Sequence, residues 1–171
     1  MRSEAFEAMG GFRAQLIAGE EPELCLRMRE SGWKIWRLDA EMTRHDAAIT
    51  RFGQWWVRAV RSGYGMMEVI ELRKRSRLTI WIRPLARSLF WGGVLPVLIA
   101  LAALIHPVLL LAALIYPLQV SRIAIASGLT FPNSWSYGFF MTISKFAEFQ
   151  GVFRYYRRRL YRKSVELIEY K

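Results

Sequence analysis

The sequence predicts an α-rich membrane protein: a transmembrane helical hairpin, an interfacial helix on either side of it, and a small soluble piece at the start. No Asp, Glu, Lys or Arg occurs between Arg87 and Arg122, and this stretch contains two apolar runs, residues 85–105 and 108–126. Each run is close to the ~20 residues that a helix needs to cross a bilayer. A soluble chain of 171 residues has too little protein to bury both runs on every side.

Residues 1–48 are expected to form the end of a soluble domain, because they are too few to bury a core of their own. A short helix is predicted over residues 4–9. A second helix is expected to begin at Pro22, since proline suits the first helical position, and to end at Gly32. The alternation in residues 34–38 predicts a short strand.

Residues 49–83 are predicted to contain an amphipathic helix over residues 51–72, followed by a basic linker. Its apolar residues recur at intervals of three and four, whereas Arg51, Gln54, Arg58 and Arg61 lie elsewhere on the helical wheel. Two interpretations are left open. The apolar face either lies in the membrane interface or packs against soluble protein.

Residues 84–127 form the predicted hairpin, with His106-Pro107 as its turn and kinks expected at Pro96 and Pro117. Trp81 and Trp91 are expected near one membrane boundary, where amphipathic rings are favourable. Proline is tolerated in such helices where neighbouring groups satisfy the freed carbonyls.

Residues 128–171 are predicted to form a second, aromatic interfacial helix and a basic cytoplasmic tail. The apolar stretch 135–153 contains Lys145, Glu148 and Gln150, which disfavour a third span. Crossing the membrane would also place the cations of 157–159 outside, against the usual distribution of positive charge.

The charge distribution favours a membrane surface with anionic lipids as the partner, not nucleic acid. The net charge is +11, from 25 Lys and Arg against 14 Asp and Glu. Basic residues gather before the first apolar run and after the second, which predicts that both ends lie on the cytoplasmic side of the cell inner membrane. The single cysteine, Cys25, excludes an internal disulfide and suits a reducing compartment.

The motif that most clearly indicates a catalytic or binding role is Gly19-Glu20-Glu21, at the start of the helix expected from Pro22. Carboxylates there have a structural explanation, because acids stabilise a helix N-terminus by ~0.3–1 kcal/mol each. They also have a chemical one, since a carboxylate in a pocket can accept a proton or bind a cation.

A wider pattern favours the chemical explanation. The stretches are GGF within residues 6–12, GEEPELCLR at 19–27 and GW at 32–33. In this order and at these gaps they resemble the acceptor-side half of family 2 inverting glycosyltransferases, which carry a GGF turn, a GED-x-(D/E)-L-x-x-R motif and a GW pair. The resemblance implies that residues 1–48 are the C-terminal remnant of a GT-A α/β domain. It extends more loosely to the hairpin, a layout that resembles membrane-anchored enzymes of bacterial surface polysaccharide synthesis.

The resemblance also implies roles for individual residues. Glu21 matches the general base that deprotonates the acceptor hydroxyl, with Glu instead of the more frequent Asp, and Glu20 would orient it. His45 matches a histidine near the sugar-nucleotide diphosphate and its Mg²⁺ or Mn²⁺, which makes it a candidate metal ligand; an exposed loop histidine is the alternative. Arg44 lies beside it as a candidate diphosphate ligand.

Two further comparisons with the family set limits on these roles. Glu23 lies about 200° round the helix from Glu21, so neutralising it is expected to affect sugar transfer much less than neutralising Glu21. Gln54 and Arg58 do not have the spacing of the Gln-x-x-Arg-Trp motif of processive members, so they are not assigned to it.

The function implied is transfer of a sugar from a nucleotide-sugar donor to a glycan or lipid-linked acceptor. The family's nucleotide-binding sheet and Asp-x-Asp metal motif do not occur in these residues. The chain alone is therefore expected to be inactive and not to bind the metal or a sugar nucleotide by itself. The alternative is a small basic hairpin protein that acts as a scaffold or lipid-binding anchor for a partner.

Overall fold

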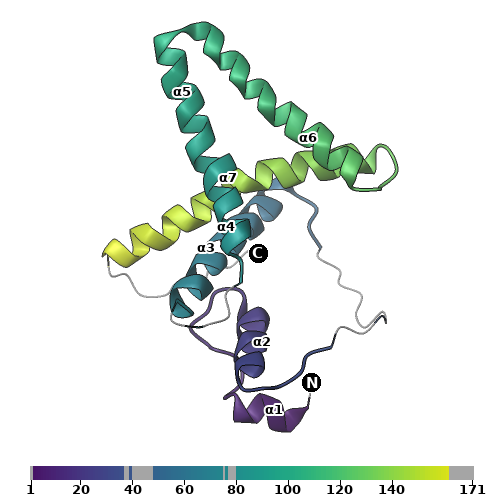
Figure 1. Ribbon diagram of the computed structural model, residues 1–171, viewed down its shortest axis with the longest axis vertical. Coiled ribbons are helices and arrows are strands. Elements are labelled where there is room, and N and C mark those ends of the chain that lie inside the picture. Colours follow the sequence, from purple (N-terminus) through teal and green to yellow (C-terminus); the bar gives the residue numbers. More distant parts are fainter. Residues whose placement is uncertain (1, 37–38, 40–47, 75, 77–79, 162–171) are drawn as a thin grey trace.

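The computed structural model describes residues 2–36, 39, 48–74, 76 and 80–161, which form helices and connecting loops (Figure 1). The soluble piece contains α1 (Ser3–Ala8) and α2 (Glu20–Glu30), and a long helix, α3 (Phe52–Leu72), follows. Two short helices, a long helix and then two candidate membrane-spanning segments follow one another along the chain; the predicted division into domains stays a prediction.

The strand predicted over residues 34–38 is wrong for the part that the structure describes. Residues 34–36 belong to no strand, and none of the described ranges contains one. Alternation of side chains is a local pattern, whereas a strand also needs a neighbouring chain for its backbone hydrogen bonds. No described segment offers that partner.

The helix α3 confirms the amphipathic helix predicted over residues 51–72, while its position in the membrane interface stays a prediction. Its buried residues include Val60, Gly63, Met67 and Val69. This face packs against protein: α7 (Asn133–Tyr161) on one side and the loop before α2 on the other. Interior packing therefore accounts for most of the apolar face of α3.

The hairpin consists of two long helical segments, residues 82–105 and 107–126. The first joins α4 (Ile82–Leu89), a π-helical turn (Phe90–Val94) and α5 (Leu95–Ile105). The second joins a 3₁₀ segment (Pro107–Leu114) and α6 (Ile115–Ala126), with His106 at the turn as predicted. The π-helical turn has a local cause, because Pro96 has no N–H to donate to the carbonyl of Gly92.

Both segments are long and apolar enough to cross a membrane. In the most apolar 18-residue stretch of each segment, only 22% and 6% of the residues are buried. The core helix of a soluble protein would be mostly buried. Large apolar side chains such as Leu104 and Ile105 are exposed near the turn. This pattern is typical of a surface that meets lipid.

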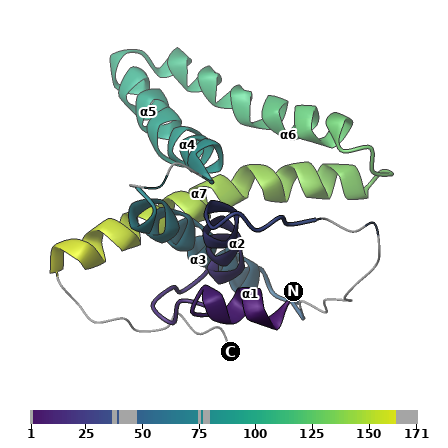
Figure 2. The ribbon, with the colours of Figure 1, turned by 60° about the horizontal axis from the view of Figure 1, so that its bottom comes forward.

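The helix α7 extends over 29 residues, Asn133–Tyr161, and crosses the open base of the hairpin (Figure 2). It packs along α3 and α6 and is not one of the two candidate spans. Within α7, Lys145 pairs with Glu148 at 2.8 Å. Two of its polar side chains contact other helices: Glu148 accepts a hydrogen bond from Ser88 in α4, and Gln150 accepts one from Trp56 in α3 at 2.9 Å. The interfacial position predicted for this helix stays a prediction.

The crossing of α3 and α7 depends on two glycines. A Cβ at Gly63 would lie 2.0 Å from the carbonyl oxygen of Glu148, and one at Gly151 would lie 2.0 Å from the carbonyl oxygen of Val60. The two backbones are therefore in direct contact, and no larger residue fits at either position.

Gly151→Ala is expected to lower the free energy of unfolding by about 1–3 kcal/mol, the usual cost of overpacking a close contact. Gly53→Ala in α3 is the matched control, because a Cβ at that position would have nothing within 4 Å and alanine favours a helix. Unfolding of both variants in detergent gives the comparison. An unchanged stability of Gly151→Ala would show that α3 and α7 do not cross this closely.

Candidate functional site

A pocket of about 970 Å³ lies where the start of α2, the loop of residues 12–19, α3 and the start of α4 meet. It combines carboxylate, guanidinium and aromatic side chains, a mixture that suits a polar ligand. The residues with such groups are Phe12, Arg13, Glu20, Glu21, Arg58, Arg61 and Trp81.

Gly19 shapes this pocket through its backbone. It caps α2 in the left-handed conformation, with φ +92°, which glycine adopts without strain. A Cβ there would also lie 2.7 Å from the ring of Trp81. The positive φ and the close approach of Trp81 both require glycine at this position. Because Gly19 has no side chain, the indole ring of Trp81 lies beside the first turn of α2.

The loop before α2 is anchored to α3 through the backbone of Ile17. Glu68 accepts a hydrogen bond from the Ile17 N–H at 3.0 Å, while Arg61 donates to the Ile17 carbonyl at 2.8 and 2.5 Å. Ile17 itself is buried. This double hydrogen bonding positions one wall of the pocket relative to α3.

Burial raises the pKa of the Glu68 carboxyl above its usual range, and the nearby Glu20 adds to the rise. The hydrogen bond from Ile17 and the Arg158 guanidinium oppose it. Glu68 is therefore a partly desolvated acid that neighbours the pocket, held by a structural hydrogen bond.

Glu20 and Glu21 both line the pocket, Glu20 half-buried and Glu21 exposed. They begin α2, where their charge is also favourable for the helix dipole. Arg13, Arg58 and Arg61 line the same pocket, so an anionic group and a hydroxyl-bearing group of one ligand both have partners there. The general-base role of Glu21 and the orienting role of Glu20 stay predictions.

Arg44 and His45 lie outside the described residues, so their predicted roles at the diphosphate and metal are untested. Within the described part of the chain, no three His, Cys, Asp or Glu side chains come together as a metal site. The metal expected from the family resemblance stays a prediction.

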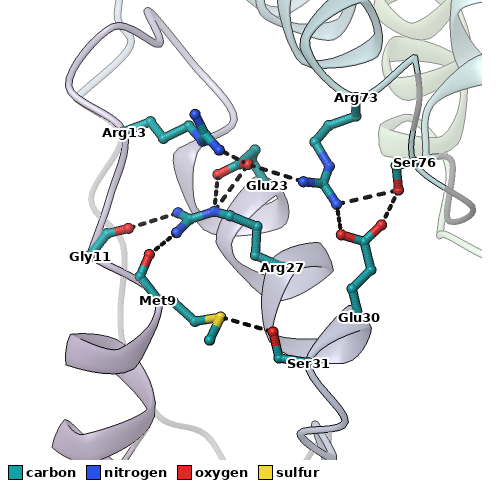
Figure 3. A network of polar contacts seen from close by, with 9 residues as sticks. All are labelled: Met9, Gly11, Arg13, Glu23, Arg27, Glu30, Ser31, Arg73 and Ser76. Atoms are coloured by element: carbon teal, nitrogen blue, oxygen red, sulfur yellow. Dashed lines mark hydrogen bonds and ion pairs between the residues drawn. The ribbon is translucent and has the colours of Figure 1, made fainter.

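Glu23 is completely buried and is the centre of an ion-pair cluster with Arg13, Arg27 and Arg73 (Figure 3). Arg13 lies 3.0 Å and Arg27 2.9 Å from its carboxylate oxygens, and Arg73 completes the cluster at 4.0 Å. We call these four residues the Glu23 cluster. The smaller role expected of Glu23 in sugar transfer stays a prediction, whereas in the fold this carboxylate joins α2 to two other segments.

The same cluster connects two parts of the sequence pattern that lie apart in the chain. Arg27 donates hydrogen bonds to the carbonyls of Met9 and Gly11, the latter at 2.7 Å, and so holds the GGF turn against α2 (Figure 3). Beyond α3, Arg73 pairs with Glu30 and contacts Ser76. The i,i+4 spacing of Glu23 and Arg27 was the sequence signal that could have revealed this role.

Several pocket residues had not been predicted as site residues, and three of them show why. Arg58 had been set aside because its spacing does not match a family motif, Trp81 had been assigned to the membrane boundary, and Arg13 had no motif at all; all three line the pocket. Gln54, by contrast, caps α3 by accepting hydrogen bonds from the N–H groups of Thr50 and Arg51, both at 3.1 Å.

Comparisons with known proteins identify no relative. No family model matches the chain, and neither the curated proteins nor the solved structures contain a significant match.

Proposed function

We propose that this chain provides the acceptor side of a membrane-bound family 2 inverting glycosyltransferase, which adds a sugar from a nucleotide-sugar donor to a glycan or lipid-linked acceptor in surface polysaccharide synthesis. The observation that carries the proposal is the position of Glu20 and Glu21. The motif that suggested a general base lies on the wall of a pocket of about 970 Å³, beside arginines and an indole ring.

In the proposed reaction the Glu21 carboxylate takes the proton of the acceptor hydroxyl. The acceptor oxygen forms a bond to the anomeric carbon while the bond from that carbon to the donor diphosphate breaks, which inverts the configuration. Glu20 orients Glu21, and Arg13 or Arg58 binds an anionic or hydroxyl group of the ligand.

Sugar transfer in membranes from the source cells tests the proposal. Membranes with the gene intact should transfer label from at least one nucleotide sugar to a lipid-linked or glycan acceptor, and membranes from a deletion strain should not. Equal transfer in both would exclude the enzymatic role.

The proposed location is the cell inner membrane, with the hairpin spanning twice and the soluble parts in the cytoplasm. This proposal rests on the two candidate spans and on the basic residues at both ends of the hairpin. A hairpin positions the pocket at the cytoplasmic surface, where nucleotide sugars are made.

Reporter fusions are expected to give cytoplasmic signals after Lys74 and after Lys171, and an external signal at Pro107. The physical reason is that cations flank the apolar segments on both sides and resist translocation. An external signal after Lys171 would mean that α7 also crosses the membrane, and the hairpin topology would be wrong.

The second candidate function is a scaffold or lipid-binding anchor, favoured by the exposed apolar hairpin and the basic flanks. The two functions differ in what the deletion strain loses. If the chain is a scaffold, its deletion releases a partner protein from the membrane, and Glu21→Gln has no effect. If the chain is part of an enzyme, Glu21→Gln alone abolishes sugar transfer.

A further inference from the structure

A second pocket, of about 930 Å³, lies at the open base of the hairpin and is distinct from the pocket that contains Glu20 and Glu21. Its lining residues come from α4, the π-helical turn, α6, α7 and the loop between α6 and α7. Each of these three helices contributes one cation: Arg87, Arg122 and Lys145. No acidic residue is among the described residues that line it.

The two arginines are available to a ligand. Both are exposed, and within the described part of the chain neither has a hydrogen bond or ion pair. Lys145 is 18% exposed and already pairs with Glu148, so its charge is largely compensated. Arg87 and Arg122, which line the same pocket from separate helices, repel each other unless an anion lies between them.

The rest of the wall and the position of the pocket indicate the kind of anion. Trp91, Ile123 and Met141 make part of the lining apolar. Arg87 and Arg122 bracket the charge-free stretch of the sequence, so both lie where the apolar helices end. Basic pockets between membrane helices at the cytoplasmic side typically bind lipid headgroups.

We propose that this pocket binds the phosphate of a phosphorylated membrane lipid, with Arg87 and Arg122 contacting the phosphate and the acyl chains lying along α5 and α6. The guanidinium groups donate hydrogen bonds to phosphate oxygens. The exposed apolar side chains of the hairpin, such as Leu98, Leu101 and Leu118, cover the tail. The site rests on the membrane location proposed above but not on the transferase activity.

The test measures lipid binding to the full chain in detergent by native mass spectrometry. Three probes separate phosphate from tail: phosphatidic acid, diacylglycerol with the same tails, and inorganic phosphate. Phosphatidic acid is expected to bind at least ten-fold more tightly than either of the others. Equal binding of diacylglycerol would show that only the tails are recognised, and equal binding of inorganic phosphate would show a free-anion site.

Variants locate the binding in this pocket. Arg87→Gln and Arg122→Gln should each weaken phosphatidic acid binding about five-fold, the value of one cation near a membrane surface, and the double variant about 25-fold. Arg83→Gln/Arg157→Gln is the matched control, because it removes two exposed cations that do not line the pocket.

The outcomes that overturn the site are an unchanged affinity in the double variant or an equal loss in the control. Circular dichroism must show the same helix content in all variants, which these exposed positions favour. Sugar transfer is measured separately. If the double variant loses lipid binding but wild-type membranes transfer no sugar, the lipid site holds and the transferase proposal is wrong. If wild-type membranes transfer sugar but the double variant binds lipid normally, only the lipid site is contradicted.

Discussion

Glu21→Gln is expected to lower sugar transfer by about 10²–10⁴, the usual contribution of a general base. The amide keeps the size of the side chain but does not accept the acceptor's proton. The measurement is the rate of label transfer from the nucleotide sugar in membranes that contain the variant. Where a nucleotide-binding half completes the enzyme, donor binding should stay close to normal, because Glu21 is proposed to contact the acceptor.

The exposed position of Glu21 makes this a clean experiment, since its neutralisation should not disturb packing. Glu7→Gln on α1 is a control, because Glu7 is also exposed and does not line the pocket. Activity retained in Glu21→Gln but lost in Glu20→Gln would move the base by one residue. Activity retained in both would leave the motif as a helix start only.

Glu23→Gln is expected to have the largest effect on stability, a loss of about 3–5 kcal/mol in the free energy of unfolding. It removes the one carboxylate shared by Arg13, Arg27 and Arg73, of which Arg27 and Arg73 are only 12% and 13% exposed. Arg27 would remain partly buried without a carboxylate partner, and Arg73 would keep only Glu30. Denaturation in detergent micelles, followed by circular dichroism, measures the change.

Glu21→Gln is the matched control for this experiment, because it makes the same chemical change two residues away on the same helix. The two variants should separate activity from stability: Glu21→Gln loses transfer and at most about 1 kcal/mol of stability, whereas Glu23→Gln unfolds much more easily. Equal stability of Glu23→Gln and the wild type would mean that the Glu23 cluster does not hold α2 in place.

The helices were largely predictable because their signals are local. The two apolar segments are recognisable from composition alone, as is the turn at His106, and α3 follows from its periodicity. The failed strand over residues 34–36 has the opposite cause. Its alternating pattern was equally local, but a strand depends on a partner that no nearby sequence specifies.

The pocket was only partly predictable. Glu20 and Glu21 were found through a motif, whereas Trp81 reaches them from the start of α4, much later in the chain, and Arg58 comes from α3. Their contribution depends on how the elements pack. A tryptophan near an apolar segment has a satisfactory explanation at a membrane boundary until its ring is seen beside Gly19.

Composition and periodicity by themselves determined the helical, membrane-type character of this protein, because a charge-free run has the same preference for lipid in any tertiary arrangement. Tertiary structure decided that the apolar face of α3 packs on α7, that Glu23 is buried among arginines, and that cations from α4, α6 and α7 share one pocket. The physical reason is distance. Ion pairs, close backbone contacts and cavities depend on which atoms lie within a few ångströms of each other. For residues far apart in the chain, their spacing in the sequence does not specify which atoms come this close.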